Sequence, residues 1–288
     1  MHPAFARGMP LAKLLILCAI VWSIVSAPCC AAPEIPFEFR AGMIWVKVNL
    51  EGRSTRLNFL LDSGAGKTVM DLGSAQRLKL NLGARETVQG VDGRCAAHRV
   101  EGFAATVGPA IVPSEILALD LRAVSVACGA RIDGLLGADF FRDRVLQIDF
   151  AAQKIRLLSR DEFRASAGQL FPLVRRNDAL CVRVGVDGNV PQWMRLDTGC
   201  SSALEWVTPG ARASRAAGTS IAAKPASRGH VETEVLLGSE RISRVKTGIH
   251  SQPIFAGEDG LIGNGLLSKF QVTVDASSSR LLLQRVVR

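Results

Sequence analysis

The chain has 288 residues, a formal net charge of +9 and 48% hydrophobic residues, and it contains no tyrosine. This length is enough for one large domain or two small domains, each with a core of its own. The excess Lys and Arg residues are scattered along the chain, which favours a solvated basic surface and argues against a nucleic-acid-binding protein.

Residues 1–31 have the features of an export signal. Basic residues precede an apolar run at 14–25, and small residues follow it at 27–32. The run is shorter than the roughly twenty apolar residues that span a bilayer, which favours a cleaved leader over a membrane anchor. We therefore predict a signal peptide at 1–31 and an exported protein, periplasmic or secreted, with a membrane-anchored form as the alternative.

The first half of the remaining chain predicts β-strands. Apolar residues alternate with polar ones at 44–50, and a turn at 51–52 leads to a second apolar run at 57–61. This pattern predicts a β-hairpin that ends at Asp62. Downstream, the segment 132–137 (Ile-Asp-Gly-Leu-Leu-Gly) is followed by an apolar stretch and a further strand.

The second half repeats this order. A strand at 181–186, a turn at 187–188 and a strand at 193–196 lead to Asp197, and the segment 258–263 (Glu-Asp-Gly-Leu-Ile-Gly) follows downstream. The period of about 130 residues is too long for a solenoid and suits two small domains. The chain is therefore interpreted as an internal duplication.

The polar stretch at 159–169, rich in small residues, is the predicted linker between the two copies. We predict an N-terminal lobe at 32–160 and a C-terminal lobe at 161–288.

Each copy holds an Asp-Ser/Thr-Gly triplet directly after an apolar strand. The triplets consist of Asp62, Ser63 and Gly64 in the first copy and of Asp197, Thr198 and Gly199 in the second. An aspartate at a strand end is held rigidly, the adjacent hydroxyl can form hydrogen bonds across a lobe interface, and the glycine lets backbone approach the carboxylate. One triplet is weak evidence on composition alone. Two triplets at equivalent positions of a duplication are strong evidence for a site.

With these motifs the chain resembles the bacterial retropepsin-like aspartic proteases, in a tandem, two-lobed, single-chain form. The resemblance rests on 59–65, 132–141 and 147–150 in the first copy and on 197–199 and 259–263 in the second. It implies an all-β fold of two tandem retropepsin-like β-barrel lobes, related by a pseudo-twofold axis, with a short helix per lobe. Because the chain has no tyrosine, it lacks the flap tyrosine of pepsin-like enzymes and is closer to the retroviral type.

The resemblance implies an aspartic endopeptidase in which Asp62 and Asp197 are the catalytic pair. Two carboxyl groups about 3 Å apart do not both ionise, so they share one proton and activate a water molecule. The residues that would support the pair are Ser63, Gly64, Thr198 and Gly199. No metal and no organic cofactor is expected.

A substrate-binding flap is expected in the first lobe. Its predicted residues are Gly90, Val91, Asp92 and Gly93. An extended peptide would pair with this flap as an added strand. In the second lobe the stretch 209–228 departs from the family pattern, and its flap is expected to be disordered or altered. The expected partner is a peptide or protein substrate, with no nucleic acid, possible membrane proximity through an uncleaved leader, and a monomeric state.

Four cysteines follow the leader, and an oxidising compartment would permit two disulfides among them. They are Cys95, Cys128, Cys181 and Cys200. Three pairings are possible, and the sequence does not choose among them. No CxxC spacing and no histidine pattern indicates a zinc site. Cys200, which stands where the family usually has alanine, is interpreted as a small packing residue.

Four further aspartates repeat between the copies and are interpreted as structural. They are Asp133, Asp149, Asp259 and Asp275. Two other functions stay open. One is a peptide-binding protein of the same fold with weak or no catalytic activity, and the other is a two-carboxylate hydrolase such as a glycosidase. The latter requires carboxyl groups more than about 5 Å apart.

Overall fold

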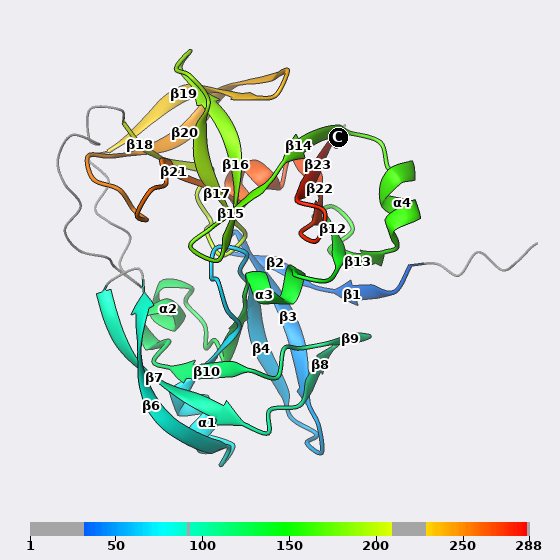
Figure 1. The fold of residues 1–288 in the computed structure, drawn as a ribbon, viewed down its shortest axis with the longest axis vertical. Helices are drawn as coiled ribbons and strands as arrows, with labels where there is room; N and C mark the ends of the chain where they lie inside the picture. Colours follow the sequence, from blue (N-terminus) through cyan, green and yellow to red (C-terminus); the bar gives the residue numbers. More distant parts are fainter. Residues whose placement is uncertain (1–31, 91–92, 209–228, 287–288) are drawn as a thin grey trace, which may run out of the picture. The chain divides into compact units, whose positions relative to one another are not determined.

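The computed structural model describes residues 32–90, 93–208 and 229–286, so the leader predicted at 1–31 lies outside the described residues. From Ala32 onward the chain forms one compact unit. Its described part is built mainly of β-strands, with a few short helices (Figure 1). No helix in this part is long and apolar enough to cross a membrane.

The elements are grouped below into a first lobe, which precedes helix α4, and a second lobe, which follows it. The first-lobe strands are β1 (Glu34–Pro36), β2 (Glu38–Arg40), β3 (Met43–Leu50), β4 (Arg56–Leu61), β5 (Val69–Asp71), β6 (Asn81–Gly90), β7 (Gly93–Glu101), β8 (Ala105–Val107), β9 (Ala110–Ile111), β10 (Ile116–Leu119), β11 (Gly134–Leu136), β12 (Val145–Asp149) and β13 (Lys154–Leu158). The second-lobe strands are β14 (Gln169–Pro172), β15 (Val174–Arg176), β16 (Ala179–Val186), β17 (Gln192–Asp197), β18 (Leu204–Val207), β19 (His230–Leu237), β20 (Glu240–His250), β21 (Gly260–Gly263), β22 (Phe270–Asp275) and β23 (Arg280–Arg285). The helices are α1 (Leu72–Arg77), α2 (Arg122–Ala127), α3 (Ala138–Phe141), α4 (Arg160–Ala165) and α5 (Asn264–Leu267).

Each lobe has a sheet of its own with the same central arrangement. In the first lobe, β4 pairs in parallel with β11, and β11 pairs antiparallel with β5. In the second lobe, β17 pairs in parallel with β21, and β21 pairs antiparallel with β18. The parallel β5–β10 and β18–β20 pairs extend the correspondence. The strands that lead to Asp62 and Asp197 therefore have equivalent neighbours.

A third sheet joins the two lobes. Its strand order is β1-β13-β12-β22-β23-β14, so it is symmetric about the antiparallel pair of β12 and β22. Buried residues of both lobes, among them Leu146 and Val274, belong to one hydrophobic cluster. Since burial of apolar surface is the main stabilising contribution to folding, the continuous sheet and core join the two lobes.

The short helix expected in each lobe is present after β11 as α3 and after β21 as α5. The first lobe also contains α1 and α2, which the sequence analysis did not predict. Asp71 is the N-cap of helix α1, and its carboxylate accepts a hydrogen bond of 2.8 Å from the Ser74 backbone N–H.

The predicted linker at 159–169 contains helix α4. Its first turn is closed by a capping box in which the Ser159 hydroxyl accepts from the Glu162 N–H and the Glu162 carboxylate accepts from the Ser159 N–H. The connection between the lobes is therefore partly helical.

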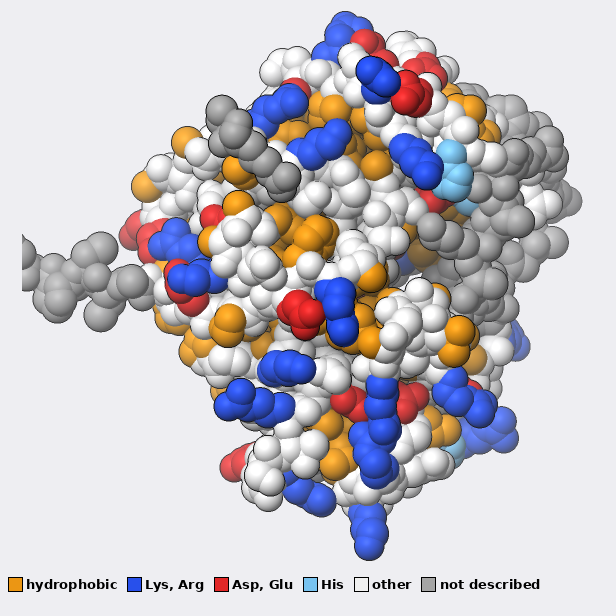
Figure 2. All heavy atoms as spheres, turned by 180° about the vertical axis from the view of Figure 1, so that it is seen from behind, with side chains coloured by type: hydrophobic (Ala, Val, Ile, Leu, Met, Phe, Trp, Pro, Cys, Tyr) orange, Lys and Arg blue, Asp and Glu red, His pale blue; other side chains and the backbone are white. Residues whose placement is uncertain are grey.

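Positively and negatively charged side chains are interspersed on the face shown in Figure 2. Lys and Arg side chains are spread from one end of this face to the other, with Asp and Glu between them (Figure 2). On this face the basic residues do not form a single block.

Candidate active site

The aspartate pair, Asp62 and Asp197, stands at the ends of equivalent strands. Asp62 directly follows β4, and its backbone N–H donates a hydrogen bond of 2.9 Å to the Leu136 carbonyl of β11. Asp197 is the last residue of β17 and pairs with Gly263 of β21. Each aspartate thus lies at the end of a strand that pairs with a parallel neighbour.

The structure brings the two triplets together. A Cβ atom added to Gly64 would lie 2.5 Å from the Asp197 Cγ atom, and one added to Gly199 would lie 2.3 Å from the Asp62 Cγ atom. Real Cβ atoms do not approach other atoms this closely, so only glycine fits at either position. The glycine of each triplet lies against the carboxyl group of the opposite triplet.

The Ser63 and Thr198 hydroxyl groups cross-link the triplets. The Ser63 hydroxyl donates to the Leu196 carbonyl (2.7 Å) and accepts from the Thr198 N–H (3.1 Å). In return, the Thr198 hydroxyl donates to the Leu61 carbonyl (2.9 Å) and accepts from the Ser63 N–H (2.9 Å). Both side chains are buried. These four hydrogen bonds confirm that the hydroxyl groups beside the aspartates link the lobes.

Backbone donors hold the two carboxylates unequally. Asp62 Oδ1 accepts hydrogen bonds of 3.0 Å from the N–H groups of Gly64 and Ala65. Asp197 Oδ1 accepts one such bond, of 2.9 Å, from the Gly199 N–H. Hydrogen bonds donated to a carboxylate favour its ionised form, so Asp62 is the better placed of the two to carry the negative charge.

The pKa values of the pair follow from this environment. Burial raises the pKa of Asp62, while the Ala65 and Gly64 hydrogen bonds and the Arg195 charge lower it. Burial raises the pKa of Asp197 to about 8, and the negative charge of Asp62 adds to the rise. A hydrogen bond between the two side chains lowers the pKa of Asp62 and raises that of Asp197. Of the two carboxyl groups, these influences favour the protonated form most strongly at Asp197.

The glycine-containing segments behind the triplets hold each loop by its backbone. The Ala138 N–H donates to the Ala65 carbonyl (2.7 Å), and the Asn264 N–H donates to the Cys200 carbonyl (2.8 Å). The Asn264 side chain also donates to the Thr198 carbonyl (2.7 Å). Each triplet loop is thus anchored by the segment that follows Gly137 or Gly263 in its own lobe.

The four repeated aspartates bind backbone and turn groups. Asp133 accepts from the Asn58 N–H (2.9 Å), and Asp259 accepts from the Trp193 N–H (3.0 Å). Asp149 and Asp275 each accept a turn N–H three residues downstream. These contacts confirm the structural interpretation.

Only part of the predicted flap lies within the described residues. Strands β6 and β7 form a hairpin whose last pair is Gly90 with Gly93. Val91 and Asp92 lie outside the described residues, as does the 209–228 stretch of the second lobe. The hairpin form is present, and contact with a substrate stays a prediction.

The four cysteines of the described chain are all free. Burial raises the pKa of the Cys200 thiol to about 12, so it remains protonated at neutral pH. A neutral thiol is a poor nucleophile, which agrees with the interpretation of Cys200 as a packing residue.

A buried ion pair beside the aspartates was missed by the sequence analysis. Arg195 Nη2 lies 2.6 Å from Glu258 Oε1, and the side chains of both residues are buried. The equivalent first-lobe residues are Leu60 and Ile132. A comparison of the two copies, position by position, would have revealed charged residues where the first copy has apolar ones.

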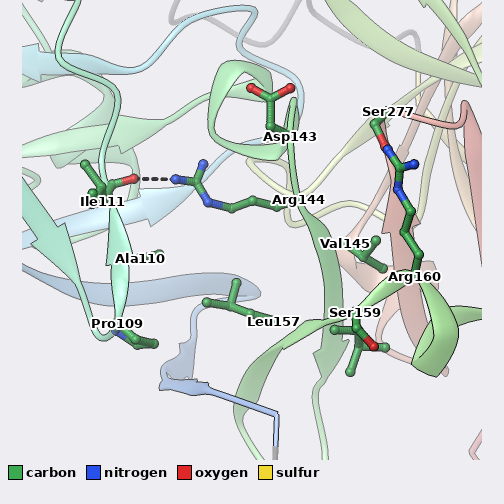
Figure 3. Close-up of a pocket in the computed structure, with 11 residues that line it drawn as sticks. Pro109, Ala110, Ile111, Asp143, Arg144, Val145, Leu157, Ser159, Arg160 and Ser277 are labelled. Carbon is green, nitrogen blue, oxygen red and sulfur yellow. Dashed lines mark hydrogen bonds between the residues drawn. The ribbon is translucent and has the colours of Figure 1, made fainter.

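A separate pocket of about 560 Å³ lies away from the triplets (Figure 3). Neither aspartate of the pair is among its lining residues, which lie at 109–111, 143–145 and 157–160 and at Ser277. Within it, Arg144 donates a hydrogen bond to the Ile111 carbonyl (Figure 3).

Comparison with known proteins agrees with this arrangement. Residues 46–140 match the family model described as aspartyl protease. Among solved structures, the aspartic proteinase from Irpex lacteus matches with a TM-score of 0.55 and 12% sequence identity, covering 89% of this chain and 98% of that one. At this identity the structural match shows the fold. The comparison with curated proteins gives no match.

The family match includes the first triplet and the supporting segment up to α3, and the fold match extends over most of both lobes. The family match supports an aspartyl protease, and with it protease activity in general, and the structural match supports the fold.

Proposed function

We propose that the protein is an aspartic endopeptidase in which Asp62 and Asp197 activate a water molecule for peptide-bond hydrolysis. The observation that carries this proposal is the close approach of each triplet glycine to the carboxyl group of the opposite triplet, which brings Asp62 and Asp197 to one site. Burial raises the pKa of both carboxyl groups there. Such a pair provides a general base and a general acid at the same time.

In the proposed mechanism, ionised Asp62 accepts a proton from the attacking water as its oxygen bonds to the scissile carbonyl carbon. Protonated Asp197 transfers its proton to the carbonyl oxygen, which gives a neutral gem-diol. As the C–N bond breaks, one carboxyl group protonates the leaving amine, and the other takes a proton from the gem-diol to restore the carbonyl. The pair returns to its singly protonated state.

The proposed substrate is an extended peptide, held by the β6–β7 hairpin as an added strand. Both aspartates belong to one chain, so the proposed enzyme acts as a monomer. We also propose that the two lobes derive from a tandem duplication, because β4, β5 and β11 have the same pairings as β17, β18 and β21.

We propose that the protein is exported and released from its leader. This rests on the sequence features of residues 1–31. N-terminal sequencing of the protein recovered from cells is expected to start near Ala32, and an intact leader in all of the recovered protein would contradict cleavage.

Incubation of the purified protein with a mixed peptide library, from acidic to mildly alkaline pH, tests the activity. Cleavage within peptides that is blocked by a statine-type inhibitor supports the proposal. Peptide binding without turnover under every condition would favour the alternative, a peptide-binding protein of the same fold.

A further inference from the structure

Arg195 is buried and contacts both Glu258 and the first triplet loop. Its Nε and Nη2 atoms form a two-pronged contact with the Glu258 carboxylate, at 2.7 and 2.6 Å. The guanidinium carbon lies 3.4 Å from the centroid of the Phe255 ring. The side chains of Arg195 and Glu258 are 6% and 0% exposed, so water does not screen this ion pair.

A third donor of Arg195 reaches the other lobe. Its Nη1 atom donates a hydrogen bond of 2.6 Å to the Gly64 carbonyl, and the Gly64 N–H in turn binds the Asp62 carboxylate. Arg195 itself stands two residues before Asp197 on β17. One side chain thus links the strand of one aspartate to the loop of the other.

The first lobe shows that the fold does not need this ion pair. At the equivalent positions it has Leu60 and Ile132, which are both buried in one hydrophobic cluster. Replacing a buried ion pair by apolar residues is often neutral or stabilising, because two charges must be removed from water to form it. A role in the site is therefore a better explanation for Arg195 than a role in folding.

We propose that Arg195 is a positioning residue of the proposed peptidase, which fixes the first-lobe loop through Gly64 and keeps one carboxylate of the aspartate pair ionised. This inference rests on the proposed function. The positive charge of Arg195 is one of the influences that lower the pKa of both Asp62 and Asp197.

The surrounding charges define what a substitution changes. Besides the aspartates, the titratable groups next to Arg195 are Glu258, its ion-pair partner, and Cys181, its neighbour on β16. The charge of Arg176 acts on the Cys181 thiol. Burial raises the pKa of Cys181 to about 12, so this thiol is neutral in the working range. Glu258 partly compensates the charge of Arg195, and Asn177 holds Glu258 through a hydrogen bond of 3.3 Å.

The double variant Arg195→Leu/Glu258→Ile tests the inference, because it copies the apolar pair of the first lobe. We expect this variant to fold. The apparent pKa of the acidic limb, where kcat/KM rises with pH, should increase by about one unit, because a nearby positive charge is lost. We also expect kcat to fall more than KM rises. Arg195→Lys keeps the positive charge and should leave the apparent pKa of the acidic limb nearly unchanged. Arg183→Leu is the control and should not change this pKa.

The variant Glu258→Gln is a second test, in which the acidic limb should shift in the opposite direction. It removes the compensating charge and leaves Arg195, so the acidic limb should move downward. If the double variant does not fold, this variant decides alone. An acidic limb that is unchanged in both folded variants, or moves in the same direction in both, would overturn the role of Arg195. Absence of cleavage by the unsubstituted protein would instead overturn the proposed peptidase.

Discussion

The two triplet loops contain the same motif in different surroundings. In the first loop two backbone N–H groups bind the carboxylate of Asp62, and apolar Leu60 stands two residues before it. In the second loop one N–H group binds Asp197, and Arg195 stands two residues before it. The hydrogen bonds of Ser63 and Thr198 are reciprocal. The motif therefore fixes where the carboxyl groups lie, and the surroundings determine which one holds the proton.

The substitutions with the largest expected effect test whether the aspartates of both loops are needed for cleavage. Asp62→Asn and Asp197→Asn should each lower kcat/KM by about a thousandfold or more, because an amide replaces a group that must exchange a proton. Initial rates on a cleaved library peptide measure this. Asp161→Asn, at a side chain 90% exposed, is the matched control. Full activity in either of the first two variants would refute the pair.

The next effect tests the close contact of each glycine with the opposite carboxyl group. Gly64→Ala and Gly199→Ala should each cost about a hundredfold in kcat, because the added methyl group separates the carboxyl groups and small displacements of reacting groups are costly. Gly73→Ala is the control, since its nearest atom would be 3.2 Å from the new Cβ. Unchanged kcat at both triplet glycines would mean that the contact is not needed.

The cross-links formed by Ser63 and Thr198 should be equal in strength. Ser63→Ala and Thr198→Ala should each lower the free energy of unfolding by about 2 kcal/mol, since each leaves a buried carbonyl and a buried N–H without a partner. Urea unfolding measures both variants. Thr198→Ser keeps the hydroxyl and should lose much less, and a clear difference between the two alanine variants would break the symmetry.

The asymmetry of the pair predicts a pH-dependent stability. Because the pKa of Asp197 is raised from 3.8 to about 8 on folding, the folded state binds this proton more tightly than the unfolded state. Protonated Asp197 therefore stabilises the folded state. This contribution is fully present below about pH 3.8 and is lost as the pH rises through about 8. Asp197→Asn should remove this dependence and be the more stable protein at mildly alkaline pH. Thermal unfolding across pH tests this, and parallel profiles for the two proteins would contradict it.

The smallest effect concerns the residue after each triplet, Ala65 in the first loop and Cys200 in the second. Cys200→Ala makes the loops alike and should change kcat/KM by less than about twofold, because the thiol is neutral and serves for packing. The same peptide assay measures it. A large loss would indicate a thiol role that the structure gives no reason to expect.

The triplets could be predicted from the sequence because each is a local motif at the end of a strand and the repeat places the copies at equivalent positions. The reciprocal hydrogen bonds of Ser63 and Thr198 follow from the same symmetry. The expected β fold rested on alternating apolar residues, and the fold match to an aspartic proteinase supports it.

Comparison of the two copies could have singled out Arg195 and Glu258, but not their contacts, because these join residues far apart in the chain. The bond from Arg195 to Gly64 joins residues from different lobes, and Glu258 reaches Arg195 only through the parallel pairing of β17 with β21. Helices α1 and α2 were also missed, since each is six residues long and too short for a clear helical period.

The central claim, that Asp62 and Asp197 share one proton, is tested most directly by NMR titration of carboxyl carbons in protein labelled at aspartate. We expect the pair to titrate in two well-separated steps, the later one near pH 8, and the separation to vanish when either residue is replaced by asparagine. Two independent titrations near the ordinary aspartate value would contradict the account.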